Sequence, residues 1–148
     1  MAAHIRFTFF GEDQVDRSLL AFAARAADMT PAWEQIRERF VGYEGRWFGS
    51  EGDGNWPALS PSYAKWKAKH FPGQKILVRT GQLKASLEKP DIATIEPAYA
   101  IFGTGDPVAG YHQTGGGNLP RRRVVDLDDS ERGEWVRVVQ RYLIEETA

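Results

Sequence analysis

Two helix starts of the same kind divide the chain and limit how it can fold. Thr30-Pro31 and Ser60-Pro61 each place a hydroxyl residue, which can cap free amide hydrogens, directly before a proline, which suits the first turn of a helix. Thr80 before Gly81 gives a third start, and the apolar run Ile76–Val78 precedes it. Two short helices are therefore expected on either side of an apolar link.

Apolar spacing predicts the remaining elements. The pattern indicates amphipathic helices where apolar residues recur every three or four positions, and strands where they alternate with polar ones. In chain order we expect a strand at His4–Phe10, a helix at Asp13–Ala27, a helix from Thr30 of uncertain end, a short basic helix at Tyr63–Phe71, a helix after Thr80, strands at Asp91–Ile95 and Tyr99–Gly103, a glycine-rich loop at Gly103–Gly117 with a turn at Tyr111-His112, a strand at Val124–Leu127, and a long helix capped by Asp128, Asp129 or Ser130.

This order predicts an α+β fold, with a small antiparallel β-sheet packed against several α-helices, including a long C-terminal helix. At 148 residues, with 42% hydrophobic and 12% aromatic residues, the chain is expected to form a single domain over residues 1–148. Tyr63 and Trp66 are expected to pin the basic helix to the core. Residues 49–55 and 103–119 have few apolar anchors and are expected to be mobile loops.

Composition argues against several classes of function. The net charge is -1, so no overall field draws the protein to DNA or to an anionic membrane. No cysteine and only three histidines (His4, His70, His112) leave little from which to build a metal site or a disulfide framework. The N-terminal apolar patch is too short for a signal peptide or a membrane span. We expect no cofactor, no metal, no membrane contact and synthesis in the cytoplasm.

Residues Arg121, Arg122 and Arg123 form the one dense positive cluster. Three adjacent guanidiniums repel one another unless phosphates or carboxylates neutralise them. The cluster is therefore expected to contact either DNA or carboxylates, the latter being those of Asp126–Asp129 or of another protein. We weight the contact with carboxylates about three to one over DNA. His112 beside Tyr111 resembles a general base, but no nucleophile or carboxylate stands at a fixed spacing to complete a mechanism, so a structural histidine is favoured. No catalytic residue is assigned, and we expect no enzyme.

Aromatic residues next to glycine-rich loops are candidates for a protein interface. Five tryptophans and eight phenylalanines exceed what a modest core easily hides, and aromatics are favoured at interface centres. The predicted protein-interface residues are Trp56, Tyr111, His112, Arg121, Arg122 and Arg123.

Several segments together resemble the phage virion morphogenesis family, which includes the small tail-completion proteins of Mu-like and related tailed phages. The segments lie within residues 47–127 and keep the motif order and approximate spacing, so their combination is far more specific than one short motif. One departure is that members have an aromatic residue after P-x-R, whereas this chain reads Arg122, Arg123, Val124. The segments are W-P-x-L-S-P from Trp56, the lysine-rich helix, I-L-V-x-T-G-x-L-x-x-S-L from Ile76, a strand at Tyr99-Ala100, Y-H-Q-x-G from Tyr111, and L-P-R-R from Leu119.

The resemblance implies a structural virion protein that acts in tail completion or head–tail joining, as a neck or tail-terminator component. It further implies a ring, six-fold in the particle, whose partners are connector, neck and tail-tube proteins, with local DNA contact in the lumen as a further expectation. The alternative reading is a small nucleic-acid-binding protein or metal-dependent phosphodiesterase that uses Arg121–Arg123 and His112.

Overall fold

The structure, a computed structural model, describes residues 11–144. Within that range it contains six helices and a two-stranded antiparallel sheet, which confirms the α+β class; the strand expected at His4–Phe10 lies outside the described residues. The elements are α1 (Glu12–Ala27), α2 (Thr30–Gly49), α3 (Pro61–His70), α4 (Gln82–Glu88), β1 (Ile92–Glu96), β2 (Tyr99–Gly103), α5 (Pro107–Thr114) and α6 (Asp129–Ile144).

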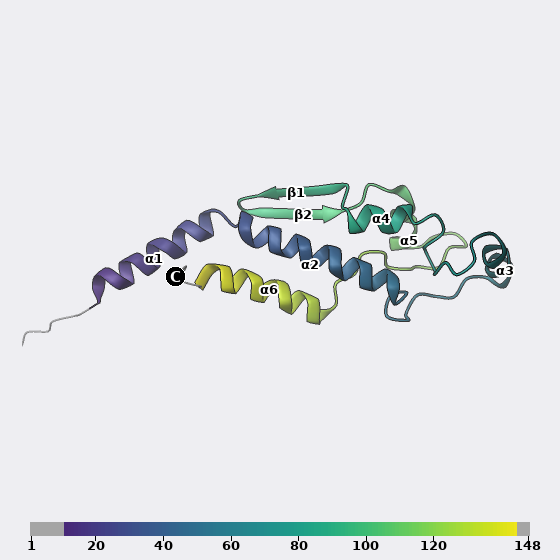
Figure 1. Ribbon diagram of the computed structural model, residues 1–148, viewed down its shortest axis with the longest axis horizontal. Helices are drawn as coiled ribbons and strands as arrows, with labels where there is room; N and C mark the ends of the chain where they lie inside the picture. Colours follow the sequence, from purple (N-terminus) through teal and green to yellow (C-terminus); the bar gives the residue numbers. More distant parts are fainter. Residues whose placement is uncertain (1–10, 145–148) are drawn as a thin grey trace, which may run out of the picture.

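Helix α2 is the element on which α4, α6 and the two strands pack (Figure 1). Pro31 lies in its first turn, and the Asp28 carboxylate accepts a hydrogen bond from the Thr30 amide at 3.0 Å. Its buried residues recur at steps of three and four, as a helix between two layers requires. The helix runs through Gly42 and Gly45 to Gly49, which settles its end. At Gly45 a Cβ atom would lie 3.1 Å from Glu88 Oε1, so glycine permits the close approach of α4.

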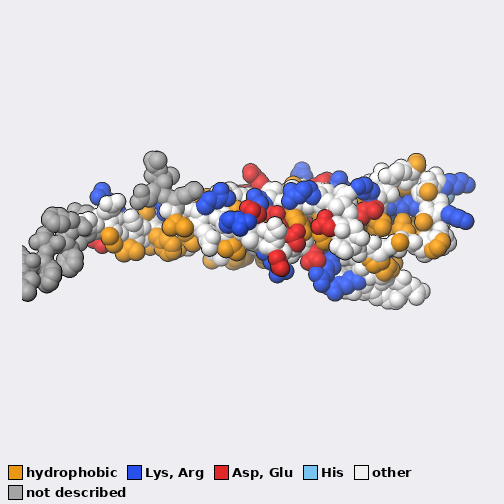
Figure 2. All heavy atoms as spheres, turned by 90° about the horizontal axis from the view of Figure 1, so that it is seen from below, with side chains coloured by type: hydrophobic (Ala, Val, Ile, Leu, Met, Phe, Trp, Pro, Cys, Tyr) orange, Lys and Arg blue, Asp and Glu red, His pale blue; other side chains and the backbone are white. Residues whose placement is uncertain are grey.

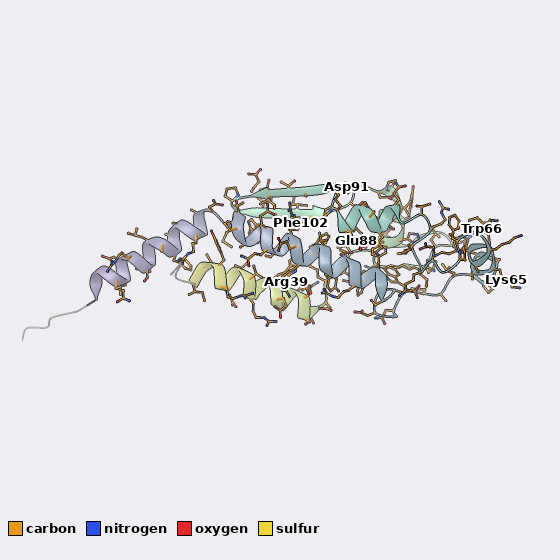
Figure 3. All side chains as sticks on the ribbon, viewed as in Figure 1. Arg39, Lys65, Trp66, Glu88, Asp91 and Phe102 are labelled. Atoms are coloured by element: carbon orange, nitrogen blue, oxygen red, sulfur yellow. The ribbon has the colours of Figure 1, made fainter. Side chains whose placement is uncertain are left out.

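The hairpin of β1 and β2 covers one side of α2 (Figure 1). Its register pairs Ile92 with Gly103 and Glu96 with Tyr99. A lone two-stranded hairpin is only marginally stable in water, so packing on α2 must hold it. Phe102 on β2, labelled in Figure 3, provides that contact. Its ring stacks on Phe40 of α2 at 5.8 Å between centroids.

Helix α6 lies along another side of α2 (Figure 1). Asp128 caps it as expected, since its side chain accepts from the Glu131 amide at 2.6 Å. The Trp135 ring meets Phe40 edge-on at 6.5 Å, which brings α6 into the same core as the hairpin. Glu131 is buried and accepts hydrogen bonds from Arg39, Arg46 and the Trp135 indole, so this ion-pair network joins the two helices.

Two sequence predictions for the region after β2 are wrong. Residues 107–114 form α5, because Asp106 caps the Val108 amide at 2.9 Å and Pro107 starts the helix, the same cap-and-proline pattern found at Ser60-Pro61.

Val124–Leu127 is not a strand. The Gln113 side-chain carbonyl accepts from the amides of Val124 and Val125, at 2.7 and 3.1 Å, so a side chain replaces the neighbouring strand.

Helix α1 extends away from the body of the molecule (Figure 1). The Arg25 guanidinium donates to the Leu143 carbonyl at 2.9 Å, and the Tyr142 hydroxyl donates to the Asp28 carbonyl at 2.7 Å, so α6 holds its C-terminal end. Its apolar side chains remain largely exposed and gather along the helix in Figure 2: Val15, Leu19, Leu20 and Phe22. None of the described helices is long and apolar enough to span a membrane.

Glu44 is a buried acid in α2 that the sequence patterns missed. It is fully buried, and neither carboxylate oxygen has a hydrogen-bond partner among the described residues. Burial raises the pKa of Glu44 to about 8 from an ordinary value of 4.5. Because the folded state then binds more protons than the unfolded chain between these values, the free energy of unfolding falls as the pH rises through this window.

We expect Glu44→Gln to remove this pH dependence and to raise the free energy of unfolding at pH 7 by about 3 kcal/mol, since pH 7 lies about 2.5 units above the unfolded value. Urea unfolding at pH 5 and pH 8 measures the effect. Glu38→Gln, an exposed glutamate of the same helix, is the control and should leave the slope unchanged. An unaltered slope in Glu44→Gln would contradict a buried, uncompensated carboxyl.

Candidate protein-docking cleft

Helices α3 and α5 lie at the end of the molecule opposite α1 (Figure 1). Residues of both helices line a cleft of about 780 Å³. It is lined by residues of four segments that lie far apart in the sequence: 58–67, 77–83, 106–112 and 118–122. Each segment contains part of a motif quoted above. The motifs therefore meet at one place in the fold.

Arg122 ties two of these segments together. Its side chain is buried, and its guanidinium donates to the carbonyls of Pro57 and Ala58 at 2.8 and 3.0 Å. Its amide donates to the His112 carbonyl at 2.9 Å. Burial lowers the pKa of Arg122. Arg122 thus joins the W-P segment to α5 and is not available to an outside phosphate.

The three neighbouring arginines do not form one positive surface. Arg121 Nε donates to the Gln113 carbonyl at 3.0 Å, and Arg123 Nη1 pairs with Asp126 at 2.7 Å in its own chain. Arg122 faces the interior, whereas Arg121 and Arg123 are exposed. The expectation of a single arginine cluster is wrong, because three different partners draw the guanidiniums apart.

Trp56 belongs to the core. It is 7% exposed, and its ring meets those of Trp47 and Phe48 edge-on at 6.4 and 5.3 Å. The indole N–H groups of Trp47 and Trp56 both donate to the Arg123 carbonyl at 2.9 Å. The expectation that Trp56 presents an interface surface is therefore wrong, since a buried indole that satisfies a carbonyl cannot reach a partner.

Gln113 is a site residue that the sequence analysis did not single out for a role. Besides accepting from two amides, its side-chain nitrogen donates to the Val125 carbonyl at 2.8 Å. One amide side chain thus satisfies three backbone groups of a segment that has no strand beside it. The position of Gln113 in the Y-H-Q-x-G motif could have marked it in the sequence. That motif does not reveal which backbone groups form hydrogen bonds with the glutamine side chain.

His112 lines the cleft, and its Nδ1 atom is buried without a hydrogen-bond partner among the described residues. Burial lowers the pKa of His112, and the positive charge of Arg122 lowers it further. The neighbouring Tyr111 is 65% exposed. The two residues of this predicted pair therefore have different surroundings, and an interface role remains a prediction for Tyr111 and for His112.

Helix α3 packs through a lysine rather than through its aromatic residues. Lys67 is buried, and its ammonium donates to the Lys75 carbonyl. Burial lowers the pKa of Lys67, and the negative charge of Glu51 opposes this by raising the pKa. Tyr63 and Trp66 are 38% and 41% exposed, so the expectation that they pin α3 to the core is wrong.

The chemistry of the cleft is that of a binding surface. Its lining combines apolar side chains such as Leu77, Leu83 and Val108 with polar and charged ones, which suits a peptide segment or a protein loop. Among residues 11–144, no group of three or more His, Asp and Glu side chains is placed to hold a metal ion.

The profile of the phage virion morphogenesis family matches residues 12–147. The chain belongs to this family. The match extends well beyond the motif-bearing residues 47–127 and takes in α1 and α6. No curated protein and no solved structure matches the chain. As a phage virion morphogenesis protein, the chain has a structural role in virion assembly.

We expect Arg122→Met to lower the free energy of unfolding by about 2–3 kcal/mol, because the carbonyls of Pro57 and Ala58 lose two hydrogen bonds from a buried, charged donor. Arg121→Met, one residue away on an exposed side chain, is the matched control and should cost about 0.5 kcal/mol or less. Urea unfolding at pH 7 compares the two. An equal loss of unfolding free energy in the two variants would show that the Arg122 hydrogen bonds do not stabilise the segments around the cleft.

Proposed function

We propose that the protein acts in tail completion or head–tail joining of a tailed phage or phage-derived particle, as a neck or tail-terminator component. The observation that carries this proposal is the cleft, in which the family's motif segments converge on a hollow lined by both apolar and polar side chains. Such a surface suits a segment of another virion protein, and connector, neck and tail-tube proteins are the partners we propose. The protein is proposed to be no enzyme.

The proposed mechanism is stepwise docking. Residues 49–55 and the parts of 103–119 that flank α5 are proposed to gain order when neighbouring virion proteins cover them, so that each ordered segment completes the next binding surface. The junctions of tailed phages are rotationally symmetric, so the subunits are proposed to form a closed ring, six-fold in the particle, through two different patches on each subunit. A local contact with DNA in the lumen is part of the same proposal.

The phosphodiesterase or nucleic-acid alternative gains nothing from the arrangement of its residues. That function needs a cluster of exposed arginines beside His112. Instead, the Arg122 guanidinium donates hydrogen bonds to two backbone carbonyls, and Arg123 is paired with Asp126. We therefore keep the assembly role as the single proposed function.

We expect particles made without this protein to accumulate as separate heads and tails, or as tails of irregular length, when counted by negative-stain electron microscopy. Supplying the wild-type protein should restore joined particles. Supplying the double reversal Arg121→Glu and Arg123→Glu should restore fewer of them, since both side chains are exposed and are proposed to face a partner. Arg122 is left intact so that folding is preserved.

The control for this experiment is the double reversal Lys89→Glu and Glu96→Lys, at exposed positions away from the cleft. It should restore joining as the wild type does. Normal infectious particles in the complete absence of the protein would overturn the assembly role. Full rescue by the arginine reversal would remove Arg121 and Arg123 from the contact and leave the assembly role standing.

A further inference from the structure

Helix α3 presents a stack of aromatic rings at the far end of the molecule. Trp66 stacks on Tyr63 and on His70, with centroids 5.5 and 4.7 Å apart, and Phe71 lies 5.7 Å away. Figure 3 places Trp66 and Lys65 at this extremity. An exposed tryptophan held in a fixed orientation by its neighbours is a typical anchor of a protein interface, because little side-chain freedom is lost on binding.

The same end of the molecule carries unpaired positive charge. Residues 54–87 contain six lysines and arginines and no aspartate or glutamate. Three of the six are used within the chain: Lys67 and Lys75 donate to carbonyls, and Lys84 pairs with Glu88. The others, Lys65, Lys69 and Arg79, are exposed and pair with no carboxylate among the described residues. We call the α3 rings with these three cations the aromatic–basic tip.

A second surface of the same chain has the opposite charge. It surrounds a hollow of about 370 Å³ lined by Tyr43, Asp53 and Asp128, among others. Arg46 also lines this hollow, and its positive charge is paired with Glu131 at 3.5 Å. The Asp128 amide donates to the Tyr43 hydroxyl at 3.4 Å, and Asp53 lines the same hollow. Burial raises the pKa of Tyr43, the hydrogen bond from the Asp128 amide lowers it, and the negative charges of the nearby aspartates raise it. Asp129 follows at the start of α6. Asp126 is paired with Arg123, so we call the other three, Asp53, Asp128 and Asp129, the acidic corner.

We propose that the aromatic–basic tip of one copy docks on the acidic corner of a second copy, so that the subunits associate head to tail. The two patches differ and lie on one chain, and a contact of this heterologous kind builds rings when the rotation closes. The carboxylates fix the register through Lys65 and Lys69, while Trp66 and Tyr63 supply apolar contact area. The inference rests on the proposed ring and names its contact.

A protein partner suits the tip better than a nucleic acid does. The face of Trp66 is already shared with Tyr63 and His70, so it is a poor platform for a stacked base. The complementary acids are present on the same molecule in matching number. Binding of duplex DNA at the tip is accordingly the rival outcome of the test.

The test exploits the absence of cysteine from the chain. Ser62→Cys on α3 and Ser130→Cys at the start of α6 put one thiol on each patch, at exposed positions. Oxidation of the double variant, both in concentrated solution and in purified particles, should give a ladder of disulfide-linked multimers on a denaturing gel. Mixed single variants should give dimers only. No ladder in either setting overturns the contact.

Charge-reversal variants of the two patches test whether the cross-linking depends on this particular contact. Lys65→Glu with Lys69→Glu reverses the tip, and Asp53→Lys with Asp129→Lys reverses the corner, each in the double-cysteine background. Either reversal alone should reduce the cross-linking rate about tenfold or more, because like charges then face each other. Mixing a tip-reversed chain carrying only Ser62→Cys with a corner-reversed chain carrying only Ser130→Cys should restore dimers. Failure of this pair to cross-link overturns the proposal.

Two further outcomes separate the explanations. The reversal Lys89→Glu with Glu96→Lys should leave cross-linking unchanged, which excludes a general effect of altered charge. Loss of duplex-DNA binding on tip reversal, with cross-linking unaffected, would assign the tip to nucleic acid and contradict the contact. Failure of the contact leaves the proposed function intact, because that function is judged by the separate counts of joined heads and tails.

Discussion

The hydrogen bonds made by residues 119–125 hold the fold together at the end that carries the cleft. Arg122 and Val124 of this segment are buried without a neighbouring strand, and buried backbone groups must be paired. Side chains do the pairing: two tryptophan indoles donate to the Arg123 carbonyl, Gln113 bonds Val124 and Val125, and Arg122 reaches back to Pro57 and Ala58. These motif residues therefore hold together the segments that line the cleft.

Local signals in the sequence were sufficient for most helices and for the hairpin. Capping residues with a following proline mark α3, Asp128 marks α6, and the apolar stripes locate α1 and α2. The same rule applied to Asp106-Pro107 would have found α5, but the many glycines nearby favoured a loop. Alternation of Val124, Val125 and Leu127 indicated a strand, yet a strand needs a partner, and the partner here is a glutamine side chain.

The candidate site was harder to predict because its properties arise from long-range contacts. Three adjacent arginines look alike in sequence, but their partners at Pro57, Gln113 and Asp126 give them three different roles. Trp56 and Trp66 are equally aromatic, and only packing decides that the first is 7% and the second 41% exposed. Two of the predicted interface residues, Trp56 and Arg122, are therefore buried in the structure, and an interface at the others stays a prediction.

The central claim is that this chain is a structural subunit of the virion, present as one ring. Quantitative mass spectrometry of purified particles, with isotope-labelled peptides of this protein and of the portal as internal standards, tests that claim directly. We predict about six copies per particle, the number that a single six-fold ring requires. Absence from purified particles, or a copy number that varies from one preparation to the next, would contradict it.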